Sequence, residues 1–118
     1  TDEDQAARTT LEDGQVAWSS TLRYDTLIRE QDTANGQVQY RFEPIPREQG
    51  GINQLISIIS EGDRGAEFSE LAIFGRKLLT FDDRTGLVCE VRGNNHLVPR
   101  QILMTGSGDE KFKGFKCE

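Results

Sequence analysis

Residues 68–93 read FSELAIFGRKLLTFDDRTGLVCEVRG, and residues 98–118 read VPRQILMTGSGDEKFKGFKCE. Four short apolar segments follow one another in this region, at residues 68–74, 77–81, 87–92 and 98–104. The breaks between them carry the glycine, aspartate and asparagine residues that favour tight turns. The region therefore predicts four antiparallel strands in a meander.

The length of 118 residues limits how many such meanders the chain can hold. A propeller blade is a four-stranded meander, and its repeat is about 40 to 45 residues long. The chain has room for roughly two to three blades, fewer than a propeller needs to close. We expect residues 1–118 to be a single incomplete all-β fragment, whose open sheet faces require a remainder that is another chain or lost sequence.

Charge and hydropathy exclude two classes of partner. A net charge of −6 opposes nonspecific binding to nucleic acid, which requires a basic surface. No apolar run approaches the roughly 20 residues of a membrane span. A small phosphate ligand stays compatible with this charge if a cation offsets the repulsion. The chain starts TDEDQAARTT, without Met or an apolar leader, so we expect a processed or truncated N-terminus.

The first half of the chain also predicts extended structure. Residues 16–19 and 21–29 are rich in aromatic and β-branched side chains, and Asn35-Gly36 then signals a hairpin. Residues 37–42 alternate strictly between polar and apolar, which is typical of a half-buried strand. Residues 52–60 fit a short helix or a buried strand equally well.

Two cysteines, Cys89 and Cys117, match no zinc-binding spacing. They fit a single disulfide bridge, and they fit two buried thiols that act as small apolar side chains. His96 lies in a polar loop, where it is expected to be a turn residue.

The acidic turn Asp82-Asp83-Arg84-Thr85-Gly86 has a purely structural explanation. An Asp at the start of a turn accepts backbone hydrogen bonds, and Gly86 supplies the left-handed conformation that closes it. Such a turn needs no ligand. Its sequence neighbours, Phe68-Ser69-Glu70-Leu71 before it and residues 114–118 (GFKCE) after it, favour a functional interpretation.

These three motifs together resemble the calcium-activated nucleotidase (apyrase) family, most closely over residues 67–118. The resemblance implies a five-bladed β-propeller, of which this chain is the N-terminal part, with residues 67–118 forming the best-matching blade and the start of the next. It also implies calcium-dependent hydrolysis of nucleoside di- and triphosphates to monophosphate and phosphate.

The resemblance assigns roles to individual residues. Asp83 corresponds to the acid at the nucleotide site, and Asp82 and Arg84 beside it are expected to bind substrate. Ser69 and Glu118 correspond to calcium ligands. Calcium takes six to eight oxygen ligands, so these two residues could supply only part of the shell.

Two further assignments rest on looser similarity. Asp2, in Asp2-Glu3-Asp4, resembles a second catalytic acid of the family, although Ala7 replaces the Ser expected before Arg8, and a frayed terminal acid explains it equally well. Lys116 lies beside Glu118 and is expected to meet phosphate oxygens, with a solvated loop as the alternative.

The mechanism that the resemblance implies is metal-assisted hydrolysis, in which Asp83 positions a water or the phosphate. No phosphate-binding G-x-x-x-x-G-K-[ST] loop and no nucleophilic triad occurs in the sequence. We expect a secreted or secretory-pathway protein whose partners are a nucleotide and the remainder of the propeller. The alternatives are a secreted noncatalytic β-rich binding module and an inert fragment of an apyrase.

Overall fold

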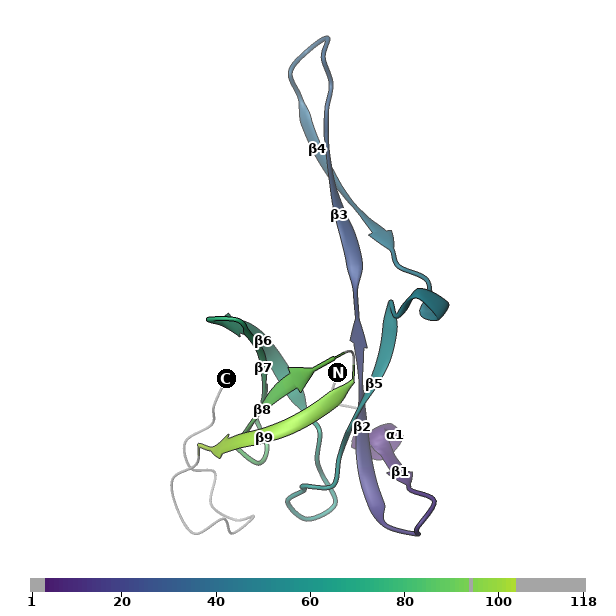
Figure 1. Ribbon diagram of the computed structural model, residues 1–118, viewed down its shortest axis with the longest axis vertical. Coiled ribbons are helices and arrows are strands. Elements are labelled where there is room, and N and C mark those ends of the chain that lie inside the picture. Colours follow the sequence, from purple (N-terminus) through teal and green to yellow (C-terminus); the bar gives the residue numbers. More distant parts are fainter. Residues whose placement is uncertain (1–3, 94, 104–118) are drawn as a thin grey trace. The chain divides into compact units, whose positions relative to one another are not determined.

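The computed structural model describes residues 4–93 and 95–103. The strands in these residues form three sheets, with the orders β1-β2-β5, β3-β4 and β6-β7-β8-β9 (Figure 1). The only helical elements described are one turn of α-helix, α1 (Asp4–Ala7), and one turn of 3-10 helix, η1 (Arg47–Gln49). The predicted all-β fold is therefore confirmed and is consistent with part of a β-propeller, whereas the number of blades stays a prediction.

The strands have the following bounds: β1 (Arg8–Thr10), β2 (Val16–Arg23), β3 (Asp25–Gln31), β4 (Val38–Pro44), β5 (Ile52–Ser57), β6 (Phe68–Phe74), β7 (Lys77–Asp82), β8 (Leu87–Arg92) and β9 (His96–Ile102). None of the helical turns in the described residues has the length and apolar character that crossing a membrane requires. Residues 21–53 form one compact unit, and the other described residues form a second.

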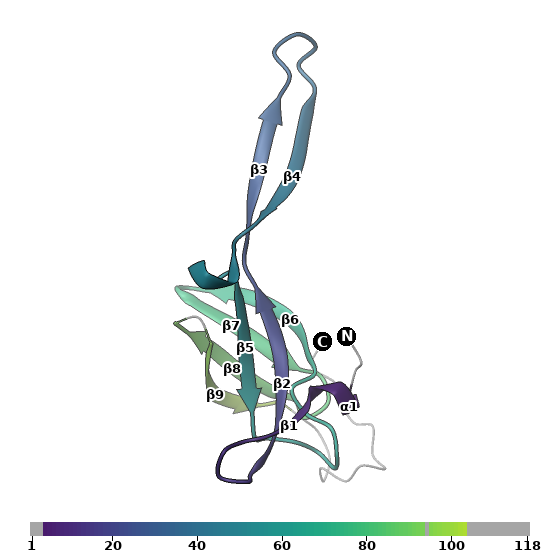
Figure 2. The same ribbon diagram turned by 90° about the vertical axis from the view of Figure 1, so that its right-hand side faces the viewer.

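The four-stranded sheet of β6 to β9 is the antiparallel meander that the sequence predicts (Figure 2). The predicted bounds of β6 and β8 are confirmed, while β7 runs one residue further and β9 begins and ends two residues earlier. Strand β8 is almost completely buried, with Leu87 and Cys89 each 1% exposed. This continuous burial explains why its sequence shows no polar alternation.

The sheet of β1, β2 and β5 settles the ambiguity of residues 52–60, because Ile52–Ser57 is strand β5, hydrogen-bonded beside β2. Ala17 and Trp18 of β2 are 0% and 5% exposed, and Leu55 of β5 is 3% exposed. The large Trp18 side chain is therefore a central part of the apolar core of this unit.

Strands β3 and β4 pair over their whole length as the hairpin that Asn35-Gly36 predicts, with Leu27 opposite Phe42. The apolar residues of residues 37–42 share one face, as expected. That face is exposed, however, with Tyr40 63% and Phe42 72% accessible, so the expected half-burial is wrong in this structure. Period-two alternation reports which side chains share a face and not what covers that face.

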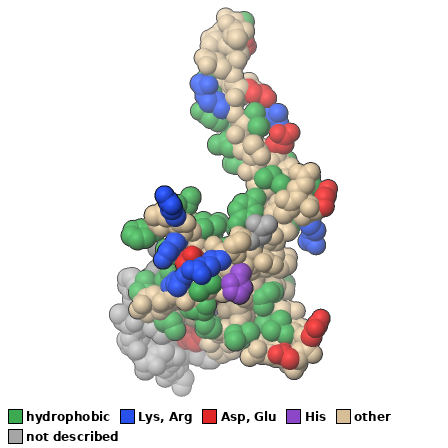
Figure 3. Space-filling view, in the orientation of Figure 1, with side chains coloured by type: hydrophobic (Ala, Val, Ile, Leu, Met, Phe, Trp, Pro, Cys, Tyr) green, Lys and Arg blue, Asp and Glu red, His purple; other side chains and the backbone are tan. Residues whose placement is uncertain are grey.

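A charged cluster lies on the β6–β9 sheet around Glu90, which is only 7% exposed. Arg92 Nε and Arg100 Nε each donate to its carboxylate at 2.9 Å, and Lys77 Nζ lies 3.9 Å from it. The Arg92 hydrogen bond, followed by those of Arg100, lowers the pKa of Glu90 despite its burial. Figure 3 shows basic side chains gathered here beside the exposed His96, which is the first residue of β9.

Candidate functional site

The turn of residues 82–86 joins β7 to β8 and is held by its own hydrogen bonds. Asp82 Oδ1 accepts from the backbone N–H groups of Arg84 at 3.0 Å and Thr85 at 3.3 Å. The N–H of Gly86 donates to the Asp82 carbonyl at 2.9 Å, and Gly86 has a φ of 69°. The turn is therefore stable as a structure without a ligand, as the sequence allows.

The Asp82 carboxyl lies under this turn and is 0% exposed. Its Oδ1 atom holds the turn, whereas its Oδ2 atom is buried without a hydrogen-bond partner in the described part of the chain. Burial is the main reason that the pKa of Asp82 is raised above its ordinary value. The structure gives Asp82 a role inside the turn, and contact with substrate stays a prediction.

The neighbouring Cys89 thiol is also buried. Burial, and secondarily the charge of Asp82, raise its pKa to about 11, which makes it unreactive at neutral pH. Cys89 is a free thiol in the structure, and Cys117 lies outside the described residues. The Cys89–Cys117 bridge therefore stays a prediction.

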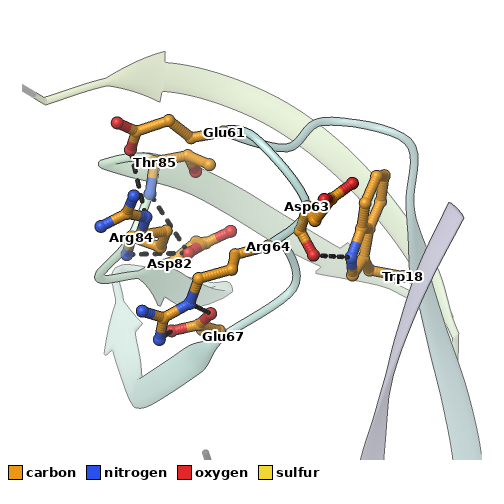
Figure 4. Close-up of polar contacts among 8 residues, drawn as sticks. All are labelled: Trp18, Glu61, Asp63, Arg64, Glu67, Asp82, Arg84 and Thr85. Carbon is orange, nitrogen blue, oxygen red and sulfur yellow. Dashed lines mark hydrogen bonds and ion pairs between the residues drawn. The ribbon is translucent and has the colours of Figure 1, made fainter. Parts of the chain in front are cut away.

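A loop of residues 61–67, which we call the clamp loop, leads into β6 and contacts the turn (Figure 4). The Glu67 carbonyl accepts from the Asp83 N–H at 3.4 Å. Glu61 Oε2 lies 3.4 Å from Arg84 Nε, and the two side chains are only 17% and 19% exposed. Both residues that follow Asp82 in the turn are thus held by the same loop.

Ser69 lies near this turn because β6 and β7 are antiparallel, with Phe68 opposite Asp82. The register shifts between Phe68 and Glu70, so Ser69 is the extra residue of a β-bulge. Bulges are frequent beside active sites, where they redirect a side chain. Ser69 is exposed, which leaves it accessible at the same end of the sheet as Asp83.

Of the two predicted calcium ligands, Ser69 lies in the described residues, and its hydroxyl is a hard oxygen donor of the kind that calcium prefers. Residues 4–93 and 95–103 contain no group of three or more His, Cys, Asp or Glu side chains placed to hold a metal. Asp2, Lys116 and Glu118 lie outside the described residues.

The sequence reasoning missed the clamp loop, although its sequence carried a signal. Glu61, Arg64 and Glu67 alternate in charge at a spacing of three within a short segment that also contains Gly65. In the structure Arg64 donates two hydrogen bonds of 2.7 Å to the Glu67 carboxylate. Charged residues in a loop are ordinarily solvated, so only the fold reveals that these lie against the acidic turn.

Comparison with known proteins identifies the family of this sequence. The sequence model of the Apyrase family matches residues 3–118. The chain belongs to the apyrase family. Over 101 residues it is 40% identical to an apyrase of Cimex lectularius, an alignment that covers 86% of this chain and 25% of that protein.

Two other members of the family share shorter segments with it. An apyrase of Phlebotomus duboscqi is 49% identical over 55 residues, which are 47% of this chain and 16% of that protein. Soluble calcium-activated nucleotidase 1 of Mus musculus is 44% identical over 64 residues, which are 54% of this chain and 15% of that protein. The chain thus spans a quarter or less of the length of these relatives.

Proposed function

We propose that this chain supplies part of the active site of a calcium-dependent enzyme that hydrolyses nucleoside di- and triphosphates to the monophosphate and phosphate. The observation that carries the proposal is the turn of residues 82–86, in which Asp83 and Arg84 are held by the clamp loop next to Ser69. Membership of the apyrase family supports the reaction class, and the name of the mouse relative supports calcium.

Asp83 is proposed to orient the attacking water and accept its proton. The water oxygen forms a bond to the terminal phosphorus, and the bond from that phosphorus to the bridging oxygen breaks. The electron pair of the broken bond stays on the nucleotide that leaves. Arg84, whose guanidinium presents a planar set of donors, binds the phosphate oxygens, and Lys116 is proposed to assist it.

Calcium, when bound, supplies positive charge that offsets the charge of the phosphate. Ser69 and Glu118 are proposed as ligands from this chain, together with residues from the remainder of the propeller. Asp2 is proposed as a second catalytic acid. We further propose that the protein acts outside the cell or in the lumen of the secretory pathway.

A noncatalytic binding module is the second candidate function. The exposed apolar face of the β3–β4 hairpin, with Tyr40 and Phe42 more than half accessible, is the observation that favours it. Such a module would bind a partner through this face with no requirement for Asp83.

The test is phosphate release from UDP, GDP, ADP and ATP by the full-length protein, with and without calcium. We expect calcium-dependent turnover that Asp83→Ala strongly lowers and Ser69→Ala reduces at limiting calcium. Turnover that is independent of calcium and unaffected by Asp83→Ala would exclude the proposed site. No turnover by a folded, calcium-saturated protein would favour the binding module.

A further inference from the structure

The clamp loop is closed on itself by short-range contacts. The Glu61 N–H donates to the Arg64 carbonyl at 2.9 Å, and the Arg64 N–H donates back to the Glu61 carbonyl at 3.2 Å. The two hydrogen bonds from Arg64 to the Glu67 carboxylate connect the middle of the loop to its end. The loop is therefore a tight, internally bonded segment.

The clamp loop is also fixed to the core. Trp18 Nε1 donates to the Asp63 carbonyl at 3.3 Å, and Ser20 Oγ donates to the Ala66 carbonyl. Gly65 is packed so closely that a Cβ atom there would lie 2.7 Å from the Ile59 carbonyl oxygen and 3.2 Å from the Trp18 ring. These contacts set the position of the loop before any substrate binds.

From this fixed position, the Glu61 carboxylate of the loop approaches the Arg84 guanidinium. Arg84 Nε lies 3.4 Å from Glu61 Oε2 but makes no hydrogen bond, and Glu61 is its one acidic partner in the described residues. A guanidinium has five N–H donors in a planar fork, so a contact at Nε leaves the terminal nitrogens able to bind an oxyanion. Glu61 thus orients the Arg84 guanidinium without occupying all of its N–H donors.

We propose that Glu61 is a positioning residue of the nucleotide site, which directs the Arg84 guanidinium toward the substrate phosphate. This inference rests on the proposed function. A half-buried acid that sits on one edge of the guanidinium restricts its rotamers. The phosphate then meets a preorganised donor, and binding is stronger because less side-chain entropy is lost.

The first test compares Glu61→Gln with the wild type in the full-length protein. We expect KM to rise roughly tenfold, with a smaller change in kcat. A tenfold rise corresponds to the loss of about one charge-assisted hydrogen bond from Arg84 to the phosphate. In the Arg84→Gln background, Glu61→Gln should have no further effect on KM. Glu30→Gln is the matched control, because it removes an exposed ion pair of 3.1 Å with Arg41, and it should change nothing.

A charge exchange separates positioning from simple support of the fold. The double variant Glu61→Arg with Arg84→Glu can re-form the ion pair, but it presents a carboxylate where the guanidinium was. We expect it to recover the Tm lost by either single variant while KM stays high. Recovery of both Tm and KM, or a lower Tm with unchanged KM in Glu61→Gln, would overturn the inference.

Calorimetric binding of a nonhydrolysable nucleoside diphosphate analogue with a methylene bridge distinguishes this inference from the proposed function. If the wild type binds the analogue without hydrolysing nucleotides, weaker binding by Glu61→Gln supports the positioning role while the enzymatic proposal fails. Equal binding by the wild type and Glu61→Gln overturns the positioning role. Absence of binding by the wild type overturns both.

Discussion

The chain contains two five-residue turns with the same internal bonding, one at residues 32–36 (DTANG) and one at residues 82–86 (DDRTG). In each, the glycine N–H donates to the carbonyl of the first Asp, at 2.8 Å for Gly36 and 2.9 Å for Gly86. The two glycines have nearly equal φ values of 72° and 69°. In each, the Asp Oδ1 accepts the N–H of the residue two positions on, at 2.8 Å and 3.0 Å.

Their surroundings differ. Asp32 and its whole turn are exposed, whereas Asp82 is completely buried and the clamp loop contacts the residues that follow it. The comparison teaches that Asp and Gly at a spacing of four specify the same shape of turn in two different surroundings. We propose that function depends on which residues occupy the second and third positions and on what holds those residues.

The largest expected difference between the turns is the effect on activity of replacing the second residue, which is Asp83 in one turn and Thr33 in the other. Asp83→Ala should lower kcat about 10²- to 10⁴-fold, which is the usual effect of removing a general acid or base. Thr33→Ala, at the matched position of the exposed turn, should leave phosphate release unchanged. Equal activity of the two variants would remove the functional distinction between the turns.

The glycines test whether the two turns matter equally for stability. Ala is unfavourable at positive φ by about 1–2 kcal/mol, so Gly36→Ala and Gly86→Ala should both destabilise the protein. Gly86 is buried, while nothing lies within 4 Å of a Cβ at Gly36, so Gly86→Ala should be the more harmful change. Urea denaturation measures this difference, and a larger loss for Gly36→Ala would contradict the burial argument.

Asp82, the first residue of the buried turn, should make the stability of the protein depend on pH. Because the folded-state pKa of Asp82 is raised, its contribution to stability is fully present at low pH and is lost as the pH rises through that pKa. Asn cannot ionise, so the Tm of Asp82→Asn relative to the wild type should increase from pH 4 to pH 7. A Tm difference between Asp82→Asn and the wild type that stays constant over this pH range would refute a special environment for Asp82.

The smallest expected effect is the change in the pKa of the Cys89 thiol when Asp82 is replaced. Its pKa of about 11 is raised mainly by burial and partly by the charge of Asp82. In a Cys117→Ser background, Asp82→Asn should lower this pKa slightly, and Asp32→Asn should leave it unchanged. The pH dependence of alkylation rate measures it, and rapid alkylation of native Cys89 at neutral pH would show that the thiol is not buried.

Much of the fold could be predicted because its signals are local. The turn-forming residues at Gly75, at residues 82–86 and at Asn35-Gly36 indicate where one strand ends and the next begins. Strands β6 and β8 begin and end where the sequence predicts. The strand at residues 52–57 could not be distinguished from a helix, since its neighbour in the sheet, β2, is distant in sequence. The exposure of Phe42 could not be predicted either, because the alternation of polar and apolar residues does not show what covers the apolar face of a strand.

The candidate site could be predicted only in part. The turn itself was recognisable, but the roles within it depend on contacts between distant residues. Asp82 and Asp83 are adjacent and identical in type, yet one is buried beneath the turn and the other is held by the Glu67 carbonyl. Glu61 was overlooked because the alternating charges of its loop do not show which residue they contact, and the contact with Arg84 depends on the fold.

The most direct test of the account is an exchange of the two turns in the full-length protein. Replacing residues 82–86 with DTANG keeps the Asp and Gly that shape the turn and removes Asp83 and Arg84. We predict a folded protein that has lost calcium-dependent phosphate release from nucleoside diphosphates, with no loss when DDRTG replaces residues 32–36. Retained activity after the first exchange would contradict the claim that this turn is the centre of the site.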